Sequence, residues 1–112
     1  MAFLSSTEAV KKEFAPGRSR YLAHTDHLMM VVIDFDDGPA TEPDPPHAHP
    51  HEQVSYVVEG EVIFYLDGQA SRLGPGDMVS VPANVPHCLQ VLTGHARLID
   101  AFSPIREDFI TP

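Results

Sequence analysis

Short apolar segments separated by glycine and proline run through most of the chain. The sequence holds 11 prolines and 7 glycines, and no stretch sustains a helical period over three turns. This pattern predicts about eight β-strands, over residues 20–23, 27–35, 53–58, 61–68, 69–73, 77–82, 87–92 and 96–102. The fifteen or so residues before them are expected to hold one short helical turn and then to break at Pro16–Gly17.

Two dipeptides mark turns between these strands. Asp67–Gly68 separates two strand-like segments, which is a strong signal for a tight hairpin, and Glu59–Gly60 is a second candidate turn. Strands of this length and spacing are typical of a sandwich or barrel. The 112 residues contain no repeat or linker, so they predict one all-β domain with an N-terminal extension over 1–17 and a core over about 18–106.

Charge and composition restrict the possible partners. The net charge is −9 because Asp and Glu number 16 and Lys and Arg only 7, which argues against nucleic acid and anionic membranes. The longest apolar segment, residues 28–33, is far shorter than the roughly 20 residues of a bilayer-spanning helix. No export signal is recognised, and Cys88 is the only cysteine, which excludes an internal disulfide. A cytoplasmic protein is expected.

Histidines cluster in the segment PPHAHPHEQ, residues 45–53. His47 and His49 are two residues apart, so in an extended chain they point to the same side. Gln53 begins the next predicted strand, and His87 begins another much later in the chain. Three imidazoles and an amide oxygen suit one divalent transition metal, such as Ni, Zn, Co, Mn or Fe. The alternative is an exposed proline-rich loop that happens to be rich in histidine.

The last predicted strand carries a carboxylate on its apolar side. Leu98, Asp100 and Phe102 share one strand face, which should point inward because two of the three are large and apolar. An inward Asp100 is costly unless it is paired or has a function, and the structural alternative is a carboxylate that accepts backbone N–H groups. Arg106 follows a turn at Ser103–Pro104 that could fold it back over the barrel mouth; the alternative is an exposed surface arginine.

The histidine segment and the region around His87 together resemble the two motifs of the cupin family. The first motif, G-x5-H-x-H-x3,4-E-x6-G, is matched at His47, His49, Gln53 and Gly60. The second, G-x5-P-x-G-x2-H-x3-N, is matched at Gly76, Pro82 and His87. The resemblance spans about residues 38–102 and implies a jelly-roll β-barrel, or double-stranded β-helix, with one metal in its mouth.

Two departures from the cupin pattern matter for the site. Gln53 replaces the glutamate ligand, which removes one negative charge and makes the metal a stronger Lewis acid and a less obvious oxygen activator. Asn84 stands at the second glycine, and asparagine tolerates a left-handed backbone best after glycine. Motif spacing favours Gln53 over Glu52 as the ligand. His51 is expected to be a solvated loop residue, and the remaining histidines to be ordinary surface residues: His24, His27 and His95.

The terminal DAFSPIREDF, joined to the histidine segment, is similar to the small single-domain cupins of the KdgF family. That family converts 4,5-unsaturated monouronates from pectin or alginate lyase digestion into linear keto forms. The resemblance implies the metal ligands His47, His49, Gln53 and His87 and the functional residues Asp100, Phe102 and Arg106. The terminal D-x-F-x3-R spacing carries most of the discrimination, because the histidine segment is common among small cupins.

The residues agree with this chemistry. Asp100 can transfer a proton, Arg106 can hold the substrate carboxylate, and Phe102 can pack on the sugar. The acidic surface does not prevent binding of an anion, because exposed charges are screened beyond about 8 Å. Two alternatives stay open: a cupin dioxygenase, which needs a redox-active metal, and a non-catalytic sugar- or metal-binding cupin. A homodimer is also expected from the pairing habit of small cupins, although no interface is visible in the sequence.

Overall fold

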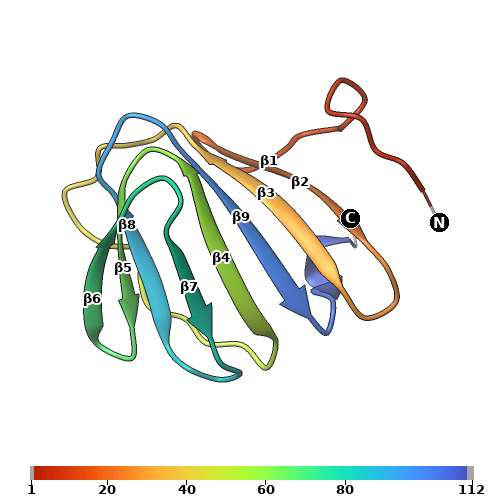
Figure 1. Cartoon of the computed structure of the whole chain (residues 1–112). Coiled ribbons are helices and arrows are strands. Elements are labelled where there is room, and N and C mark those ends of the chain that lie inside the picture. Colours follow the sequence, from red (N-terminus) through yellow and green to blue (C-terminus); the bar gives the residue numbers. More distant parts are fainter. Residues whose placement is uncertain (1, 111–112) are drawn as a thin grey trace.

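Two antiparallel β-sheets build the protein in the computed structural model, which describes residues 2–110 (Figure 1). The larger sheet has six strands in the order β1-β2-β3-β9-β4-β7, and the smaller has three in the order β6-β5-β8. The strands are β1 Lys12–Ala15, β2 Arg18–His24, β3 Met29–Phe35, β4 Glu52–Glu59, β5 Val62–Leu66, β6 Gln69–Leu73, β7 Met78–Val81, β8 His87–Val91 and β9 Ala96–Ser103. A short 3₁₀ helix, η1 Glu107–Phe109, follows β9. The predicted all-β jelly-roll class is confirmed.

All eight predicted strands are present, and the turn residues explain how they connect. Asp67 and Gly68 both have positive φ, 50° and 81°, and they link Leu66 directly to its cross-strand partner Gln69 in a two-residue hairpin. Asn84 has φ of 65°, so it adopts the left-handed conformation expected where a glycine is usual. These turns set the register of the smaller sheet and bring His87 to the start of β8.

The N-terminal segment differs in part from its expectation. The helical turn is present, since the backbone N–H groups of Glu8 and Ala9 donate to the Ser5 carbonyl at 3.1 and 3.0 Å. The chain then forms β1, which pairs with β2 and was not predicted. Its sequence, KEFA, is mostly exposed and lacks alternation, so only the neighbouring strand reveals it as an edge strand.

The core lies between the sheets and is built from alternate residues of the larger one. Leu98, Asp100 and Phe102 are all buried on the inner face of β9, as their alternation predicted. Cross-strand pairing places Ser55 opposite Asp100 and Gln53 opposite Phe102. The polar residues of β4 and β9 therefore meet at one end of the apolar core, whose members are Met29, Val31, Ile33, Phe35, Val57, Val62, Val91, Ala96, Leu98 and Phe102. Among residues 2–110, no helix has the length and apolar character needed to cross a bilayer.

Asp34 is buried on the opposite face of β3 under two basic side chains. Arg97, its direct cross-strand partner on β9, donates two hydrogen bonds to the carboxylate at 2.7 and 3.1 Å. Lys11 donates a third at 3.1 Å. These bonds, chiefly those of Arg97, hold the pKa of Asp34 below its usual range.

We expect Asp34→Asn to lower the free energy of unfolding by about 1.5–3 kcal/mol at neutral pH, because bonds to a charged group are lost. A carboxyl group whose pKa is lowered by folding stabilises the protein at pH values above its unfolded-state pKa of about 3.9. This stabilisation disappears as the pH falls through the pKa of the folded state. Urea unfolding of both proteins along a falling pH series should therefore show the two stabilities converging. Asp26→Asn, at an exposed carboxylate, is the control; equal stability of Asp34→Asn and wild type at neutral pH would contradict this role.

Candidate metal centre and adjoining pocket

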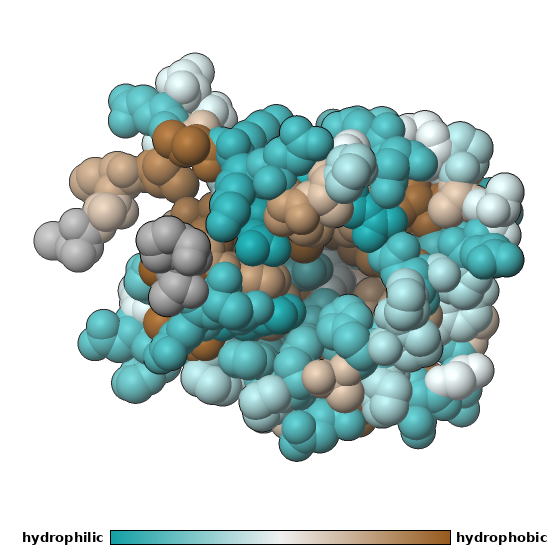
Figure 2. All heavy atoms as spheres, turned by 180° about the vertical axis from the view of Figure 1, so that it is seen from behind, coloured by the Kyte–Doolittle hydropathy of each residue, from teal (hydrophilic) through white to brown (hydrophobic). Residues whose placement is uncertain are grey.

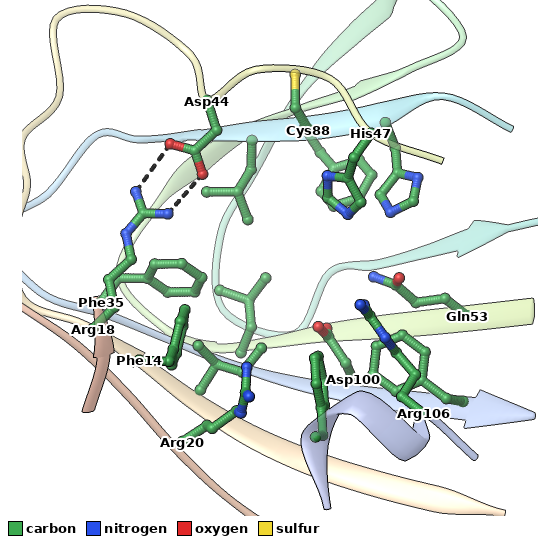
Figure 3. Close-up of a pocket in the computed structure, with 17 residues that line it drawn as sticks. Phe14, Arg18, Arg20, Phe35, Asp44, His47, Gln53, Cys88, Asp100 and Arg106 are labelled. Atoms are coloured by element: carbon green, nitrogen blue, oxygen red, sulfur yellow. Dashed lines mark hydrogen bonds and ion pairs between the residues drawn. The ribbon is translucent and has the colours of Figure 1, made fainter. Parts of the chain in front are cut away.

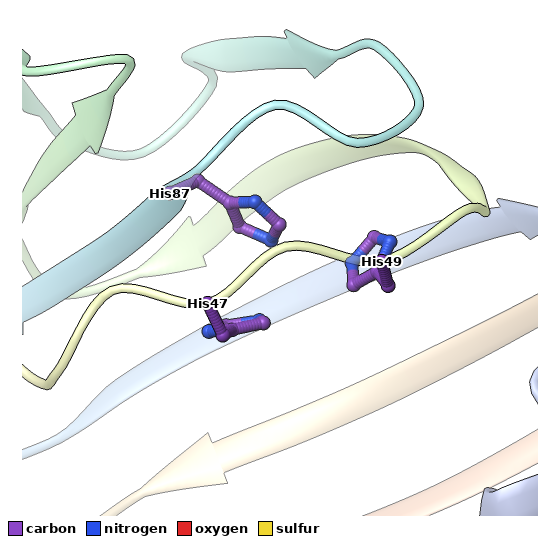
Figure 4. A group of neighbouring side chains, drawn as sticks. All are labelled: His47, His49 and His87. Carbon is purple, nitrogen blue, oxygen red and sulfur yellow. The ribbon is translucent and has the colours of Figure 1, made fainter.

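Backbone pairing between a loop and a strand brings three histidines together. His47 and His87 exchange two backbone hydrogen bonds, of 3.0 and 2.9 Å, so the loop before β4 lies against the start of β8. Their ring centroids are 4.3 Å apart, and the His49 ring lies 4.8 Å from that of His87. One nitrogen from each of the three rings lies within 4.8 Å of the others, and the rings face a common space (Figure 4).

Hydrogen bonds orient these side chains so that lone pairs face that space. Nδ1 of His87 donates to the Val85 carbonyl at 2.9 Å, which leaves the buried Nε2 as an acceptor without a partner among the described residues. Nδ1 of His49 likewise donates to the carbonyl of His51 at 3.0 Å. The Nε2 atom of His49 is therefore also an acceptor. Metal-ligating histidines are commonly held by such a bond from their other nitrogen.

Gln53 completes the set with its amide oxygen. Its Nε2 donates to Ser55 Oγ at 2.9 Å, so Oε1 is the atom that faces Nε2 of His49 at 3.0 Å. Two acceptors at this distance repel unless a cation lies between them, and about 3 Å is the separation expected for adjacent ligands roughly 2.1 Å from one metal. Glu52 is exposed, whereas Gln53 is buried. These donors fit a divalent transition metal.

The surroundings of His47 and His87 favour the neutral, ligating form of these imidazoles. Burial is the main cause that lowers the pKa values of His47 and His87, and the neighbouring histidines and Arg106 lower them further. His51 differs from its expectation as a solvated residue. It is half-buried, with its ring 5.4 Å from that of His49, and burial lowers its pKa.

A cavity of about 170 Å³ adjoins the histidines. Its lining includes most of the residues singled out from the sequence: His47, Gln53, His87, Asp100, Phe102 and Arg106. Figure 3 shows His47, Gln53, Asp100 and Arg106 around one space, and the view from behind the molecule shows a hollow in its surface (Figure 2). His49 lies beside this cavity, edge-on to Phe102 with ring centroids 5.8 Å apart.

Asp100 carries a carboxyl group with an unusual environment. It is 8% exposed, and its Oδ1 atom has no hydrogen-bond partner among the described residues. Burial raises its pKa to about 6, against the opposing effects of a hydrogen bond with Ser55 and the charge of Arg106. Such a carboxyl group can both accept and release a proton near neutral pH.

Arg106 folds back over the pocket after the turn that ends β9. Its guanidinium carbon lies 5.4 Å from the centroid of Phe102 and 4.1 Å from that of Phe109. It also pairs with Asp108 at 2.9 Å. The positive charge is therefore held at the pocket by two aromatic rings and one carboxylate.

Three charged pocket residues, Arg18, Arg20 and Asp44, were not found from the sequence. Arg18 binds Asp44 through two hydrogen bonds, of 2.7 and 3.0 Å, and closes one end of the cavity (Figure 3). Arg20 lies two residues further along β2, on the same face. The only signal for these arginines was the alternation in "RSR", which does not reveal which face is covered.

His95 is more than an ordinary surface histidine. Its two ring nitrogens contact Asp36 at 2.6 Å and Glu59 at 2.8 Å, and these contacts, chiefly that of Asp36, raise its pKa. His95 therefore links the loop after β3, the end of β4 and the loop before β9.

Comparisons with known proteins show the family to which the chain belongs. A family model described as Cupin domain matches residues 31–102. The pectin degradation protein KdgF of Dickeya dadantii is 33% identical over 94 residues, which are 83% of each chain. The structure of KdgF from Halomonas sp. matches with a TM-score of 0.88 and 36% identity, over 97% of this chain and 98% of that one. Quercetin 2,3-dioxygenase of Bacillus subtilis is 30% identical over 82 residues, which are 72% of this chain but 24% of that protein.

Proposed function

Because the chain belongs to the cupins and, among them, to the KdgF family, we propose that it is an enzyme of pectin or alginate breakdown. Its substrates are 4,5-unsaturated monouronates, and its products are linear 5-keto-4-deoxyuronates. The observation that carries this proposal is one pocket, lined by a buried carboxyl group and a guanidinium, that adjoins a His3Gln donor set.

The reaction requires proton transfer and no change of oxidation state. The substrate is a cyclic hemiacetal whose C4=C5 enol ether is conjugated with a carboxylate. Ring opening and ketonisation remove a proton from oxygen and deliver one to C4. Asp100 is suited to both transfers, because a carboxyl group with a pKa of about 6 can hold or release a proton at its unpartnered Oδ1. Such acid–base catalysis contributes about 10²–10⁴ in rate.

The other pocket residues bind and orient the sugar. Arg106 provides a planar fork for the carboxylate, and Phe102 presents an apolar surface that keeps water from the reacting atoms. A divalent metal, when bound, supplies Lewis acidity toward the sugar oxygens. The residues that would hold it are His47, His49, Gln53 and His87.

Mixing the protein with unsaturated monouronate tests this function. The ultraviolet absorbance of the conjugated double bond should disappear faster than in buffer, and the linear keto product should accumulate. The absence of any acceleration with metal-loaded protein would favour a non-catalytic sugar- or metal-binding cupin. That alternative gives no function to the buried carboxyl group of Asp100.

A dioxygenase is the second candidate, favoured by the partial match to quercetin 2,3-dioxygenase. If the reaction is proton transfer, removal of O₂ should leave kcat unchanged, and redox-inert Zn²⁺ should support turnover. The rate under argon and under air, measured with an oxygen electrode in parallel, decides between them. Oxygen consumption equal to substrate loss would establish the dioxygenase instead.

We expect the protein to form a homodimer through the outer face of the larger sheet. Val32, Ile99, Tyr56 and Met78 form a continuous apolar row across β3, β9, β4 and β7, and Met78 is 65% exposed. Apolar rows of this kind are typical of interfaces. Light scattering should give twice the chain mass for wild type and a lower mass for Met78→Lys. The control is Gln69→Lys on the smaller sheet; a monomeric wild type would exclude this interface. A cytoplasmic location and the absence of a nucleic-acid partner stay predictions.

A further inference from the structure

Arg20 occupies the same pocket as the proposed catalytic residues, but on a different strand. On β2 it is paired with Ile33, which in turn is paired with Leu98 on β9, so the three lie in one row across the sheet. Ile33 and Leu98 belong to the buried core, and the next inward residue of β9 is Asp100. Arg20 therefore points from the sheet into the cavity, as its place in the lining also shows (Figure 3).

Among the described residues, aromatic rings contact the Arg20 guanidinium and no carboxylate pairs with it. Its guanidinium carbon lies 4.7 Å from the centroid of Phe14 and 3.8 Å from that of Phe109. Its Nε atom is buried without a hydrogen-bond partner among residues 2–110. Within the same residues every other arginine forms an ion pair with Asp or Glu. A half-buried cation without an anion is costly, and contact with aromatic rings compensates only part of that cost.

A second guanidinium lies on the same aromatic ring. The Arg106 guanidinium carbon is 4.1 Å from the Phe109 centroid and that of Arg20 is 3.8 Å from it, so both cations contact the same ring. Burial is the main cause that lowers the pKa of Arg20, and repulsion by the charge of Arg106 lowers it further. Asp108, a carboxylate near both arginines, is bonded to Arg106. The ring of Phe109 therefore contacts two guanidinium groups, of which only Arg106 is paired with a carboxylate among the described residues, and Asp100, whose pKa burial raises, lines the same pocket.

We propose that Arg20 and Arg106 together bind a single carboxylate of the ligand, one guanidinium to each side of it, at the edge of Phe109. A carboxylate has two oxygens and can accept from two guanidinium groups at once. This assignment rests on the proposed function for the identity of the ligand as a sugar acid. It makes Arg20 a specificity-determining residue that favours uronates over neutral sugars.

Equilibrium binding of D-glucuronate and of glucose, followed by NMR titration, tests the clamp without any reaction. Metal-loaded wild type should bind glucuronate more tightly than glucose. Arg20→Gln and Arg106→Gln should each weaken glucuronate binding by about ten- to hundredfold and leave glucose binding unchanged. Because both guanidinium groups contact one carboxylate, the fold-loss of glucuronate affinity in the double variant should be much smaller than the product of the two single fold-losses. Multiplicative losses, or an Arg20→Gln variant that binds like wild type, would overturn the proposal.

Further variants separate binding from structure. Arg20→Lys keeps the cation between Phe14 and Phe109 but lacks the planar fork, so it should fold normally and weaken glucuronate binding several-fold. If Arg20→Gln does not fold, this variant decides the matter, and wild-type affinity in it would exclude the clamp. Arg72→Gln removes an exposed arginine outside the pocket and should change nothing. A wild type that binds glucuronate but does not convert unsaturated uronate would refute the proposed function and leave the clamp standing.

Discussion

Asp100→Asn is expected to lower kcat by about 10²–10⁴-fold with little change in KM or metal content. The amide keeps the size of the side chain but cannot exchange a proton at the unpartnered Oδ1 position. Steady-state kinetics on unsaturated monouronate, with elemental analysis and thermal melts of the same preparations, measure the effect. Nearly full kcat in a well-folded Asp100→Asn would end the acid–base role.

The pH profile provides an independent reading of Asp100. If the carboxylate form begins the reaction, kcat/KM should rise as the pH increases through about 6, where this group loses its proton. Ser55 donates a hydrogen bond that lowers the pKa of Asp100, so Ser55→Ala should move the rising limb to higher pH. Since Ser55 also accepts a bond from Gln53, metal content must be measured in the same variant. An unmoved limb with the metal retained would show that another group titrates.

His87→Ala is expected to lose most of the metal, and with it the activity. Wild-type protein should carry close to one transition metal per chain, because four donor atoms converge on one space. The substitution removes one of the three imidazoles. Among the described residues, His87 is also the member of this trio whose Nε2 is buried without a hydrogen-bond partner. Elemental analysis after dialysis measures the loss.

His24→Ala is the matched control for His87→Ala, because His24 is exposed on β2 and outside the cavity. Equal metal in wild type and His87→Ala would exclude the ligand assignment. Acid should also release the metal, since only neutral imidazole ligates. The lowered pKa values of His47 and His87 place this release below the ordinary histidine value of about 6.5.

Local rules were enough to predict much of the fold and the inward direction of several polar side chains. Two-residue alternation placed Asp100 and Phe102 on the inner face of β9, since the side chains of a strand point to opposite faces in turn. Backbone preferences predicted the Asp67–Gly68 hairpin and the left-handed Asn84. Motif spacing distinguished Gln53 from its exposed neighbour Glu52. Each of these inferences depends on a few consecutive residues.

Only the tertiary structure revealed the contacts made between distant segments. The edge strand β1 has no apolar alternation of its own, and its Phe14 meets Arg20 only because β1 pairs with β2. Arg20 and Arg106 are far apart in the sequence, yet both lie against Phe109 of the C-terminal segment. The sequence around Asp34 and His95 does not reveal their partners. The structure shows that Arg97 pairs with Asp34 and that Asp36 pairs with His95. Burial and charge pairing depend on which strands become neighbours, and strand alternation fixes the face of a side chain but not the groups that cover it.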